Sequence, residues 1–187
     1  MSNLLIVPHQ DDEIFCYSYL DKLKKMIIVF EGGGEPINNT MDRIDLFYAR
    51  CDETIKTARE FGINDVEFLR VSRPYKGWEL NKAIEKVFKN DYGFVITTME
   101  EDLHPDHKAL SVAVKKYCKK DLYGFIVHTN SLDYYTEKIK PDISVKLSDK
   151  EFKHKIRLAN NYVTQKHFLP NVIRRKSYKW ERYWRLN

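Results

Sequence analysis

Two short polar clusters hold the side chains of this sequence that are best suited to chemistry. One lies near the start of the chain at residues 8–13, Pro-His-Gln-Asp-Asp-Glu, and the other is His-Pro-Asp-His at residues 104–107. Imidazole and carboxylate groups are common ligands of catalytic zinc, which takes three protein ligands and keeps one position for water. Together the clusters contain enough such groups for a metal site and a general base.

The spacing favours His9, Asp12 and His107 as the metal ligands. His9 and Asp12 can converge from one turn, while His107 enters from the second cluster. Two histidines and a carboxylate suit Zn²⁺ and also Fe²⁺ or another divalent metal. Asp11 and His104 then remain for catalysis. Metal-assisted hydrolysis needs a carboxylate that takes a proton from water and an acid that faces the oxyanion or the leaving group.

Each cluster follows an apolar run that predicts a buried strand, and each precedes a predicted helix. In an open parallel sheet, such strand-to-helix junctions gather at one rim, so we expect the clusters to meet there. Asp106 is placed to orient an imidazole from outside the ligand set. The competing interpretation is that the acidic residues and Pro105 only mark helix starts. Both clusters lie at strand-to-helix junctions and carry complementary metal ligands, which favours a metal site instead.

The predicted elements alternate between strand and helix. Strands are expected at residues 4–7, 26–30, 66–71, 93–98, 123–129 and 143–147, and helices at residues 12–25, 41–61, 78–89, 105–118 and 149–165. This order, with nearly continuous apolar strands, predicts an α/β fold: a single-domain, Rossmann-like, mostly parallel sheet flanked by helices. With 187 residues, 43% of them hydrophobic, and no linker-like segment, the sequence predicts one domain over residues 1–187.

The two clusters resemble the motifs of the LmbE-like (PIG-L) superfamily of zinc-dependent N-acetylglucosaminyl deacetylases. That family opens with Pro-His-Pro-Asp-Asp-Glu after its first strand and later has His-Pro-Asp-His. Gln10 replaces the second proline here, at a position that stiffens a turn and supplies no ligand. The resemblance also covers the strand and glycine-containing turn at residues 27–34, Arg50 with Glu53, the Asp-Ile-Ser segment at residues 142–144, and the stretch from Lys155 to Gln165.

The resemblance implies an enzyme that removes the acetyl group from an N-acetylated amino sugar, an N-acetylglucosamine conjugate. It implies the roles already favoured by the residue types: zinc at His9, Asp12 and His107, Asp11 as the general base, and His104 at the oxyanion or the leaving amine, with Asp106 tuning His104.

Two further positions bear on the substrate. Arg50 matches an arginine that contacts substrate in some relatives. The tyrosine that helps to polarise the amide carbonyl in certain members has no counterpart, because no tyrosine lies between Thr97 and His104. The glycine triplet at residues 32–34 lacks the spacing of a dinucleotide-binding fingerprint, and it could shape a sugar pocket or form a permissive turn.

The formal net charge is +5, and residues 166–187 form a C-terminal segment in which Arg and Lys alternate with Tyr and Trp. Such a segment can bind phosphate and stack on sugars or bases, or it can pack its aromatic rings on the domain with its charges in solvent. The packed interpretation is favoured. The basic balance favours an anionic, phosphate-bearing substrate. The alternatives are an N-acyl hydrolase for another glycosylated metabolite or modified nucleotide and, less favoured, a nucleic-acid-binding module that uses this segment.

The apolar runs are too short to span a membrane, and the N-terminus lacks a signal-peptide pattern. Cys16, Cys51 and Cys118 are widely spaced and do not form a metal-binding pattern, which predicts reduced thiols. These features predict a cytoplasmic protein without a membrane span.

Overall fold

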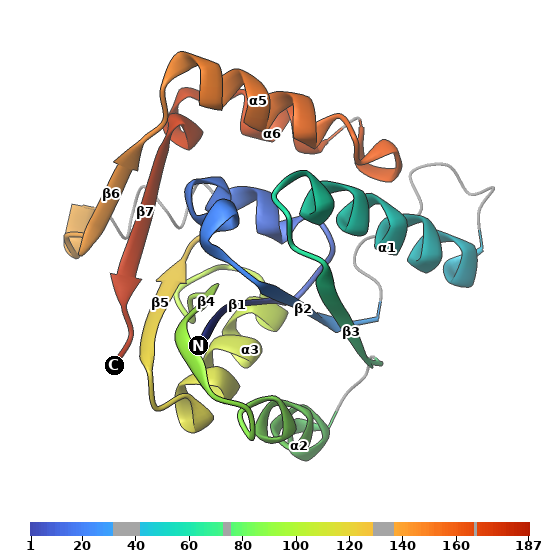
Figure 1. The fold of residues 1–187 in the computed structure, drawn as a ribbon, viewed down its shortest axis with the longest axis vertical. Helices are drawn as coiled ribbons and strands as arrows, with labels where there is room; N and C mark the ends of the chain where they lie inside the picture. The colour runs from blue at the N-terminus through green and yellow to red at the C-terminus, as the bar shows by residue number, and fades with distance from the viewer. Residues whose placement is uncertain (32–41, 73–75, 129–136, 167) are drawn as a thin grey trace.

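A computed structural model of the chain describes residues 1–31, 42–72, 76–128, 137–166 and 168–187. Within these residues, a seven-stranded sheet has the order β3-β2-β1-β4-β5-β7-β6 (Figure 1). The strands are β1 (Ser2–Val7), β2 (Lys25–Phe30), β3 (Asp65–Val71), β4 (Tyr92–Thr98), β5 (Asp121–Phe125), β6 (Ile143–Lys146) and β7 (Trp180–Arg185). Strands β1 to β5 pair in parallel, whereas β7 is antiparallel to both of its neighbours, β5 and β6.

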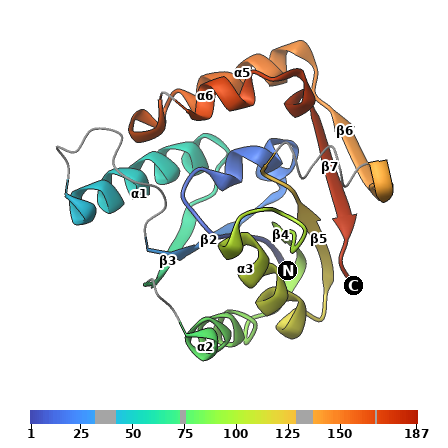
Figure 2. The same cartoon turned by 180° about the vertical axis from the view of Figure 1, so that it is seen from behind.

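Helices cover both faces of the sheet. The α-helices are α1 (Arg43–Glu60), α2 (Gly77–Val87), α3 (Pro105–Tyr117), α5 (Asp149–Ala159) and α6 (Leu169–Ile173), and the 3₁₀ helices are η1 (Asp12–Lys22), η2 (Val163–Gln165) and η3 (Lys176–Lys179). Helices α2 and α3 lie on one face, and η1, α1, α5 and α6 lie on the other (Figures 1 and 2). None of the helices in the described ranges is both long and apolar enough to cross a membrane.

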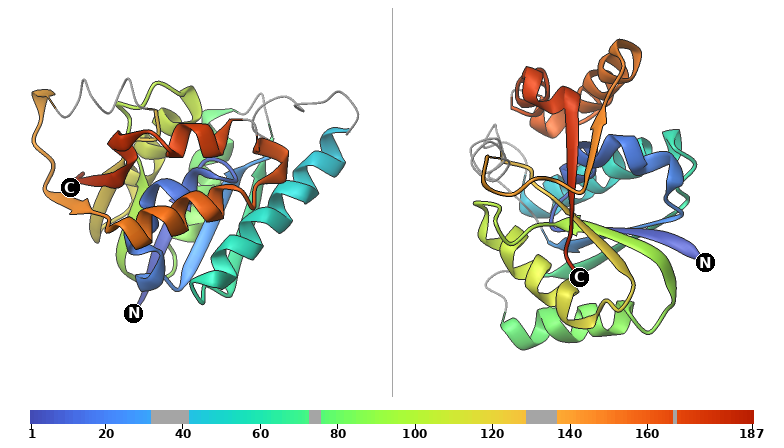
Figure 3. Two further views of the ribbon diagram at one scale, coloured as in Figure 1. Left: turned by 90° about the horizontal axis from the view of Figure 1, so that it is seen from above. Right: turned by 90° about the vertical axis from the view of Figure 1, so that its left-hand side faces the viewer.

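Burial on both faces explains the apolar strands. In β1, Leu4 and Ile6 pack into the cluster with α2 and α3, whereas Leu5 and Val7 pack into the cluster with η1, α1 and α5. All four side chains have 0% exposure. Successive side chains of a strand point to opposite faces, so a strand between two helical layers needs apolar residues at every position. Figure 3 shows the sheet between these layers. The predicted α/β fold with a mostly parallel sheet is confirmed.

Several predicted boundaries were wrong. The helix expected at residues 12–25 is the 3₁₀ helix η1, which ends at Lys22 and has non-helical backbone angles at Cys16. The helix expected at residues 149–165 ends at Ala159, and the Asn160 side chain donates a hydrogen bond to the carbonyl of Ile156, 2.9 Å away. Residues 160–162 then lead into η2, and Tyr162 is fully buried. The expected glycine turn at residues 32–34 lies outside the described residues.

Strand β7 was missed by the sequence analysis. It lies within the C-terminal segment, where cations alternate with aromatic residues, and this pattern was interpreted as a terminal segment packed on the domain, without a strand. Glu181 and Tyr183 share one side of the strand and are 3% and 1% exposed, and Trp184, on the other side, is also buried at 2% exposure. Glu181 is tolerated inside because Lys155 Nζ lies 2.5 Å from its carboxylate. The C-terminal segment therefore packs on the domain, as the favoured interpretation expected.

Candidate active site

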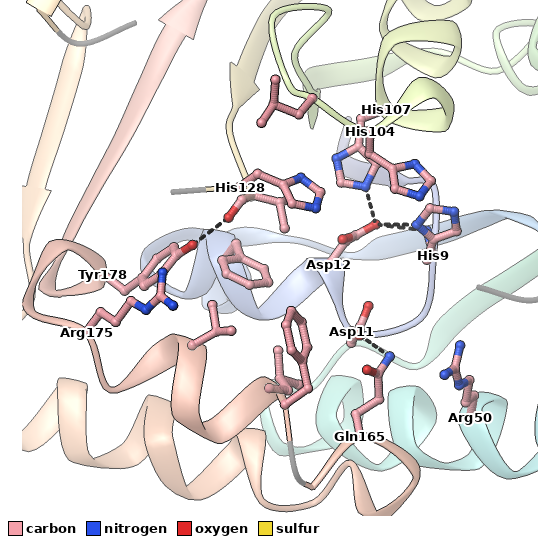
Figure 4. A pocket seen from close by; sticks show the side chains of 16 residues that line it. His9, Asp11, Asp12, Arg50, His104, His107, His128, Gln165, Arg175 and Tyr178 are labelled. Atoms are coloured by element: carbon pink, nitrogen blue, oxygen red, sulfur yellow. Dashed lines mark hydrogen bonds and ion pairs between the residues drawn. The ribbon is translucent and has the colours of Figure 1, made fainter. Parts of the chain in front are cut away.

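The two polar clusters meet at a pocket of about 460 Å³ at the carboxyl ends of β1 and β4 (Figure 4). Six of the seven predicted site residues line this pocket: His9, Asp11, Asp12, Arg50, His104 and His107. The seventh, Asp106, is 3% exposed and contacts His9. The expectation that separate strand ends would bring these residues together is therefore correct at the level of position. Their chemical roles are a separate question.

Two of these residues, His9 and His107, converge on the carboxylate of a third, Asp12. Asp12 Oδ2 lies 3.4 Å from His9 Nδ1 and 3.4 Å from His107 Nε2. It also accepts a hydrogen bond from the backbone N–H of His9 at 3.0 Å, which fixes the turn after β1. All three side chains are at least nine-tenths buried. The spacing of His9 and Asp12 within one turn therefore produces the convergence that the sequence predicted.

A second carboxylate holds the far side of each imidazole. Asp106 Oδ2 lies 2.7 Å from His9 Nε2, and Asp102 Oδ2 lies 3.3 Å from His107 Nδ1. Each ring therefore turns one nitrogen to its own carboxylate and the other toward Asp12. This is the arrangement in which an outer carboxylate orients a metal-binding histidine and strengthens it as a ligand.

A divalent cation fits this donor set. Two ligands about 2.1 Å from a tetrahedral metal lie about 3.4 Å apart, which matches the separations of Asp12 Oδ2 from the two imidazole nitrogens. The charge also fits, because three buried carboxylates, those of Asp12, Asp102 and Asp106, lie against the imidazoles here. His104 has a donor atom within 4.8 Å of those of His9 and His107, so it lies close to the same point.

The carboxylates perturb the ionisation of this cluster. Burial acts to lower the pKa of His107, but the charge of Asp12 and the hydrogen bond to Asp102 outweigh it and raise the pKa to about 10. For Asp12, burial acts to raise the pKa, but the charge and hydrogen bonds of His107 and His9 hold it well below its ordinary value. The site therefore favours positive charge next to the Asp12 carboxylate.

Asp11 lies beside these groups in a strained turn. Its φ of 104° is in the left-handed region, which residues with a side chain rarely adopt. The turn is held because the backbone N–H of Asp11 donates to Glu13 Oε2 at 2.9 Å and the side chain of Gln165 donates to Asp11 Oδ2. Burial raises the pKa of Asp11 well above its ordinary value, and the charges of Asp12 and Glu13 act in the same direction. Buried and held in this way, the carboxylate is a stronger base than an exposed aspartate.

His104 forms the N-cap of α3, with Pro105 in the first turn. Its Nδ1 accepts a hydrogen bond from the backbone N–H of Asp106 at 3.2 Å. Asp106 therefore meets His104 through its backbone and His9 through its carboxylate, whereas the family resemblance implied that Asp106 tunes His104. The His104 ring lies 4.9 Å from the His9 ring and 5.0 Å from the His107 ring, measured between centroids.

Arg50 reaches the pocket from α1 and is only 2% exposed. Its Nε and Nη1 have no hydrogen-bond partner among the described residues. Burial lowers the pKa of Arg50, although the charges of Asp11 and Glu53 oppose this effect. A buried guanidinium with donors left over is suited to a ligand that carries oxygen atoms.

The sequence analysis gave no role at the site to Asp102, His128 and Gln165. The side chains of His128 and Gln165 line the pocket, and Asp102 lies behind it with 0% exposure. His128 could have been found, because it follows a strand end at the same rim, but the strand was predicted to continue to residue 129. Gln165 follows no strand end, and its one signal in the sequence is the family resemblance of the stretch from Lys155 to Gln165.

The model of the PIG-L family, described as GlcNAc-PI de-N-acetylase, matches residues 4–118. No curated protein sequence matches the chain. Three solved structures share the fold. The N,N'-diacetylchitobiose deacetylase of Pyrococcus horikoshii is 15% identical with a TM-score of 0.73, over 98% of this chain and 83% of that one. The conserved protein TT1542 of Thermus thermophilus is 18% identical with a TM-score of 0.70, over 100% and 95%. The 4-carboxy-2-hydroxymuconate hydratase GalB of Pseudomonas putida is 18% identical with a TM-score of 0.69, over 94% and 84%.

Proposed function

The chain belongs to the PIG-L family of GlcNAc-PI de-N-acetylases, and on this premise we propose that it is a metal-dependent hydrolase that removes the acetyl group from an N-acetylated amino sugar. One observation carries the proposal. Asp12 Oδ2 lies 3.4 Å from a nitrogen of His9 and 3.4 Å from a nitrogen of His107, each imidazole is backed by a further carboxylate, and Asp11 lines the same pocket. Because a hydratase shares the fold, the fold alone does not select the reaction.

His9, Asp12 and His107 would hold the metal, with zinc as the first candidate and Fe²⁺ or another divalent metal as alternatives. A bound divalent metal supplies Lewis-acid polarisation of the acetyl carbonyl and makes the attacking water more acidic. Asp106 and Asp102 orient the two imidazoles through the nitrogens that face away from Asp12.

Asp11 takes the proton of the attacking water. Its carboxylate is held by the Gln165 side chain and lies in the turn that also carries Asp12, so it is fixed next to the metal ligands. In Figure 4, His104 and Asp11 lie on opposite sides of the Asp12 carboxylate, and His104 faces the oxyanion or the departing amine. Acetate and a free amino sugar are the products.

The substrate is an N-acetylglucosamine conjugate, larger than the acetyl group alone. The pocket of about 460 Å³ exceeds the space that an acetyl group needs, and it extends from Arg50 and Gln165 past the metal ligands to Arg175. Arg50 has guanidinium donors that hydroxyl or phosphate oxygens of a sugar conjugate can accept. A phosphate-bearing conjugate is therefore the favoured substrate.

The test is acetyl release from a panel of N-acetylglucosamine conjugates, followed by mass spectrometry and an acetate assay. Protein loaded with zinc or Fe²⁺ is expected to remove one acetyl group, and protein treated with a chelator is not. His104→Ala should keep its metal and lose more in kcat than it gains in KM, because His104 acts mainly in the transition state. Loss of metal from this variant would make His104 a ligand. Absence of acetyl release from every conjugate, with metal bound, would contradict the proposed function.

A further inference from the structure

His128 is an imidazole at the pocket that the proposed mechanism does not use. It lies just beyond β5, and its side chain lines the pocket with that of His104 (Figure 4). The two rings are stacked, with centroids 6.0 Å apart and planes 10° from parallel. Two parallel imidazoles at one pocket wall can contact neighbouring atoms of the same ligand, so the proton position on each ring matters.

Asp102 determines the orientation and the tautomer of His128. Asp102 Oδ1 lies 2.5 Å from His128 Nδ1, and Asp102 Oδ2 accepts the backbone N–H groups of Val127 and His128 at 2.8 Å and 3.3 Å. The carboxylate can only accept hydrogen bonds when ionised, so Nδ1 of His128 carries the proton. In the neutral imidazole, Nε2 is then a hydrogen-bond acceptor.

His104 has the opposite arrangement. Its Nδ1 accepts the backbone N–H of Asp106, so the proton of the neutral ring is on Nε2, which is a donor. The stacked pair therefore combines one donor nitrogen and one acceptor nitrogen. A secondary amide has the complementary groups, since its carbonyl oxygen accepts and its N–H donates.

We propose that His128 accepts a hydrogen bond from the N–H of the scissile amide and so selects secondary amides over esters. This inference rests on the proposed function, because it assigns the amide of that reaction to the pocket. An ester that has oxygen in place of the N–H would set a lone pair against the acceptor nitrogen of His128. The unmatched acceptor makes that ester a poorer ligand.

A second metal site is the competing explanation of the same residues. Asp102, His107 and His128 have potential donor atoms within 4.8 Å of one another. However, Nδ1 of His128 and Nδ1 of His107 both lie against the Asp102 carboxylate, at 2.5 Å and 3.3 Å. The carboxylate lies within ion-pair distance of both nitrogens, so we assign it to positioning the rings.

The test compares two substrates that differ at one atom: an N-acetylglucosamine conjugate and the ester in which oxygen replaces its N–H. For His128→Phe, which keeps an aromatic ring without the acceptor, kcat/KM for the amide should fall about tenfold or more, as expected for a lost polar contact. Its kcat/KM for the ester should not fall and should rise, because the acceptor nitrogen that opposes the ester oxygen is then absent. His128→Gln, which retains an acceptor oxygen, should recover part of the amide activity. Metal content should equal that of the wild type in both variants.

His154→Phe is the matched control, because His154 is also a partly exposed imidazole but contacts Tyr17 and Arg157 away from the pocket. Equal losses on amide and ester for His128→Phe would overturn the inference while leaving the proposed function intact. Loss of metal would overturn it in favour of a ligand role.

Failure of the proposed function gives a different result. In that case the metal-loaded wild type releases no acetyl group, and calorimetric binding of the same amide and ester then tests His128 alone. Selective weakening of amide binding by His128→Phe supports the inference. No selectivity, or no binding by the wild type, overturns it.

Discussion

Asp11 adopts a backbone conformation that is unfavourable for a residue with a side chain. Its φ of 104° carries a steric cost that glycine would avoid. The conformation persists because Glu13 accepts the Asp11 N–H and Tyr162 in turn donates to Glu13, which is fully buried. Strain held by buried hydrogen bonds is characteristic of functional sites. The turn points the Asp11 carboxylate into the pocket, where Gln165 holds it.

At this scale, Asp11→Asn tests the base directly. The variant keeps the size of the side chain but removes its capacity to take a proton, so kcat should fall by on the order of a hundredfold or more. Metal content, measured by plasma mass spectrometry, should match that of the wild type. Asp21→Asn, at an exposed position, is the control and should retain full activity. Activity of Asp11→Asn near that of the control would remove Asp11 from the mechanism.

The carboxylate of Asp106, which lies behind His9, should affect the affinity for the metal. Asp106→Asn removes the charge that lies 2.7 Å from His9 Nε2, so the metal affinity should fall about 10- to 100-fold. Competition with a coloured chelator would measure this loss independently of turnover. Asp52→Asn, at an exposed position on α1, is the matched control. An unchanged affinity would show that His9 does not depend on Asp106.

At the scale of elements, β7 joins the C-terminal segment to the rest of the sheet. Glu181 is 3% exposed and accepts from Lys155 Nζ at 2.5 Å, from the backbone N–H of Ser18 at 2.7 Å and from the Tyr183 hydroxyl at 2.9 Å. One carboxylate therefore connects α5, η1 and β7. Helix η1 carries the pocket residues Asp12 and Phe15, whereas none of the described pocket residues lies on α5 or β7. Strand β7 therefore supports the site without lining it.

Glu181→Ala should destabilise the protein strongly. It leaves Lys155, which has 0% exposure, as a buried charge without its carboxylate, and loss of one partner of a buried pair costs about 3–5 kcal/mol. Chemical denaturation would measure the free energy of unfolding. Glu85→Ala, at an exposed position, should change it by less than about 0.5 kcal/mol. The double variant Lys155→Met with Glu181→Leu should recover part of the loss, since no charge is then left buried. A loss in Glu181→Ala no larger than in the control would contradict this account.

At the scale of the whole molecule, the net charge of +5 is not concentrated in a free C-terminal segment. Lys179 is paired with Asp149 and Arg185 with Asp121. Two arginines, Arg50 and Arg175, line the pocket instead. The attraction for an anionic substrate should therefore act at the pocket, with a long-range contribution from the net charge.

A phosphate-bearing conjugate should then show a salt-dependent KM. Added salt screens the attraction, so KM should rise with ionic strength while kcat changes little. Initial rates measured across a range of potassium chloride concentrations test this, with a neutral conjugate of the same sugar as the control. Equal turnover of a neutral chitooligosaccharide, with no salt dependence of either substrate, would contradict the preference for an anion.

The three buried thiols should make the free energy of unfolding depend on pH. Burial raises the pKa of Cys16 well above its ordinary value and that of Cys51 to about 11, and it raises the pKa of Cys118 as well. The folded thiols stay protonated at a pH at which an unfolded thiol ionises, so the free energy of unfolding should fall as the pH rises through about 9. A thiol reagent at about pH 8, just below the ordinary thiol pKa, should react slowly with the native protein and with all three cysteines after denaturation. Rapid reaction of the native protein would show that these side chains are accessible.

The sequence by itself determined that the two polar clusters meet at one pocket. The apolar runs at residues 4–7 and 93–98 require burial on both faces, which a parallel sheet between helices provides. The carboxyl ends of such strands share one rim, so His9, Asp12 and His107 had to lie near one another. The convergence of His9 and Asp12 is local, because a single turn holds both. These conclusions depend on short-range pattern and on one general property of parallel sheets.

Only the tertiary structure decided how the site is supported. The contact of Asp106 with His9, of Gln165 with Asp11, and of Asp102 with His128 each joins separate segments of the chain. The insertion of β7 between β5 and β6 is decided in the same way. Residue types alone do not show which carboxylate near the rim pairs with which imidazole. The choice among them follows from packing of distant elements, in which each buried polar group must find a partner at hydrogen-bond distance.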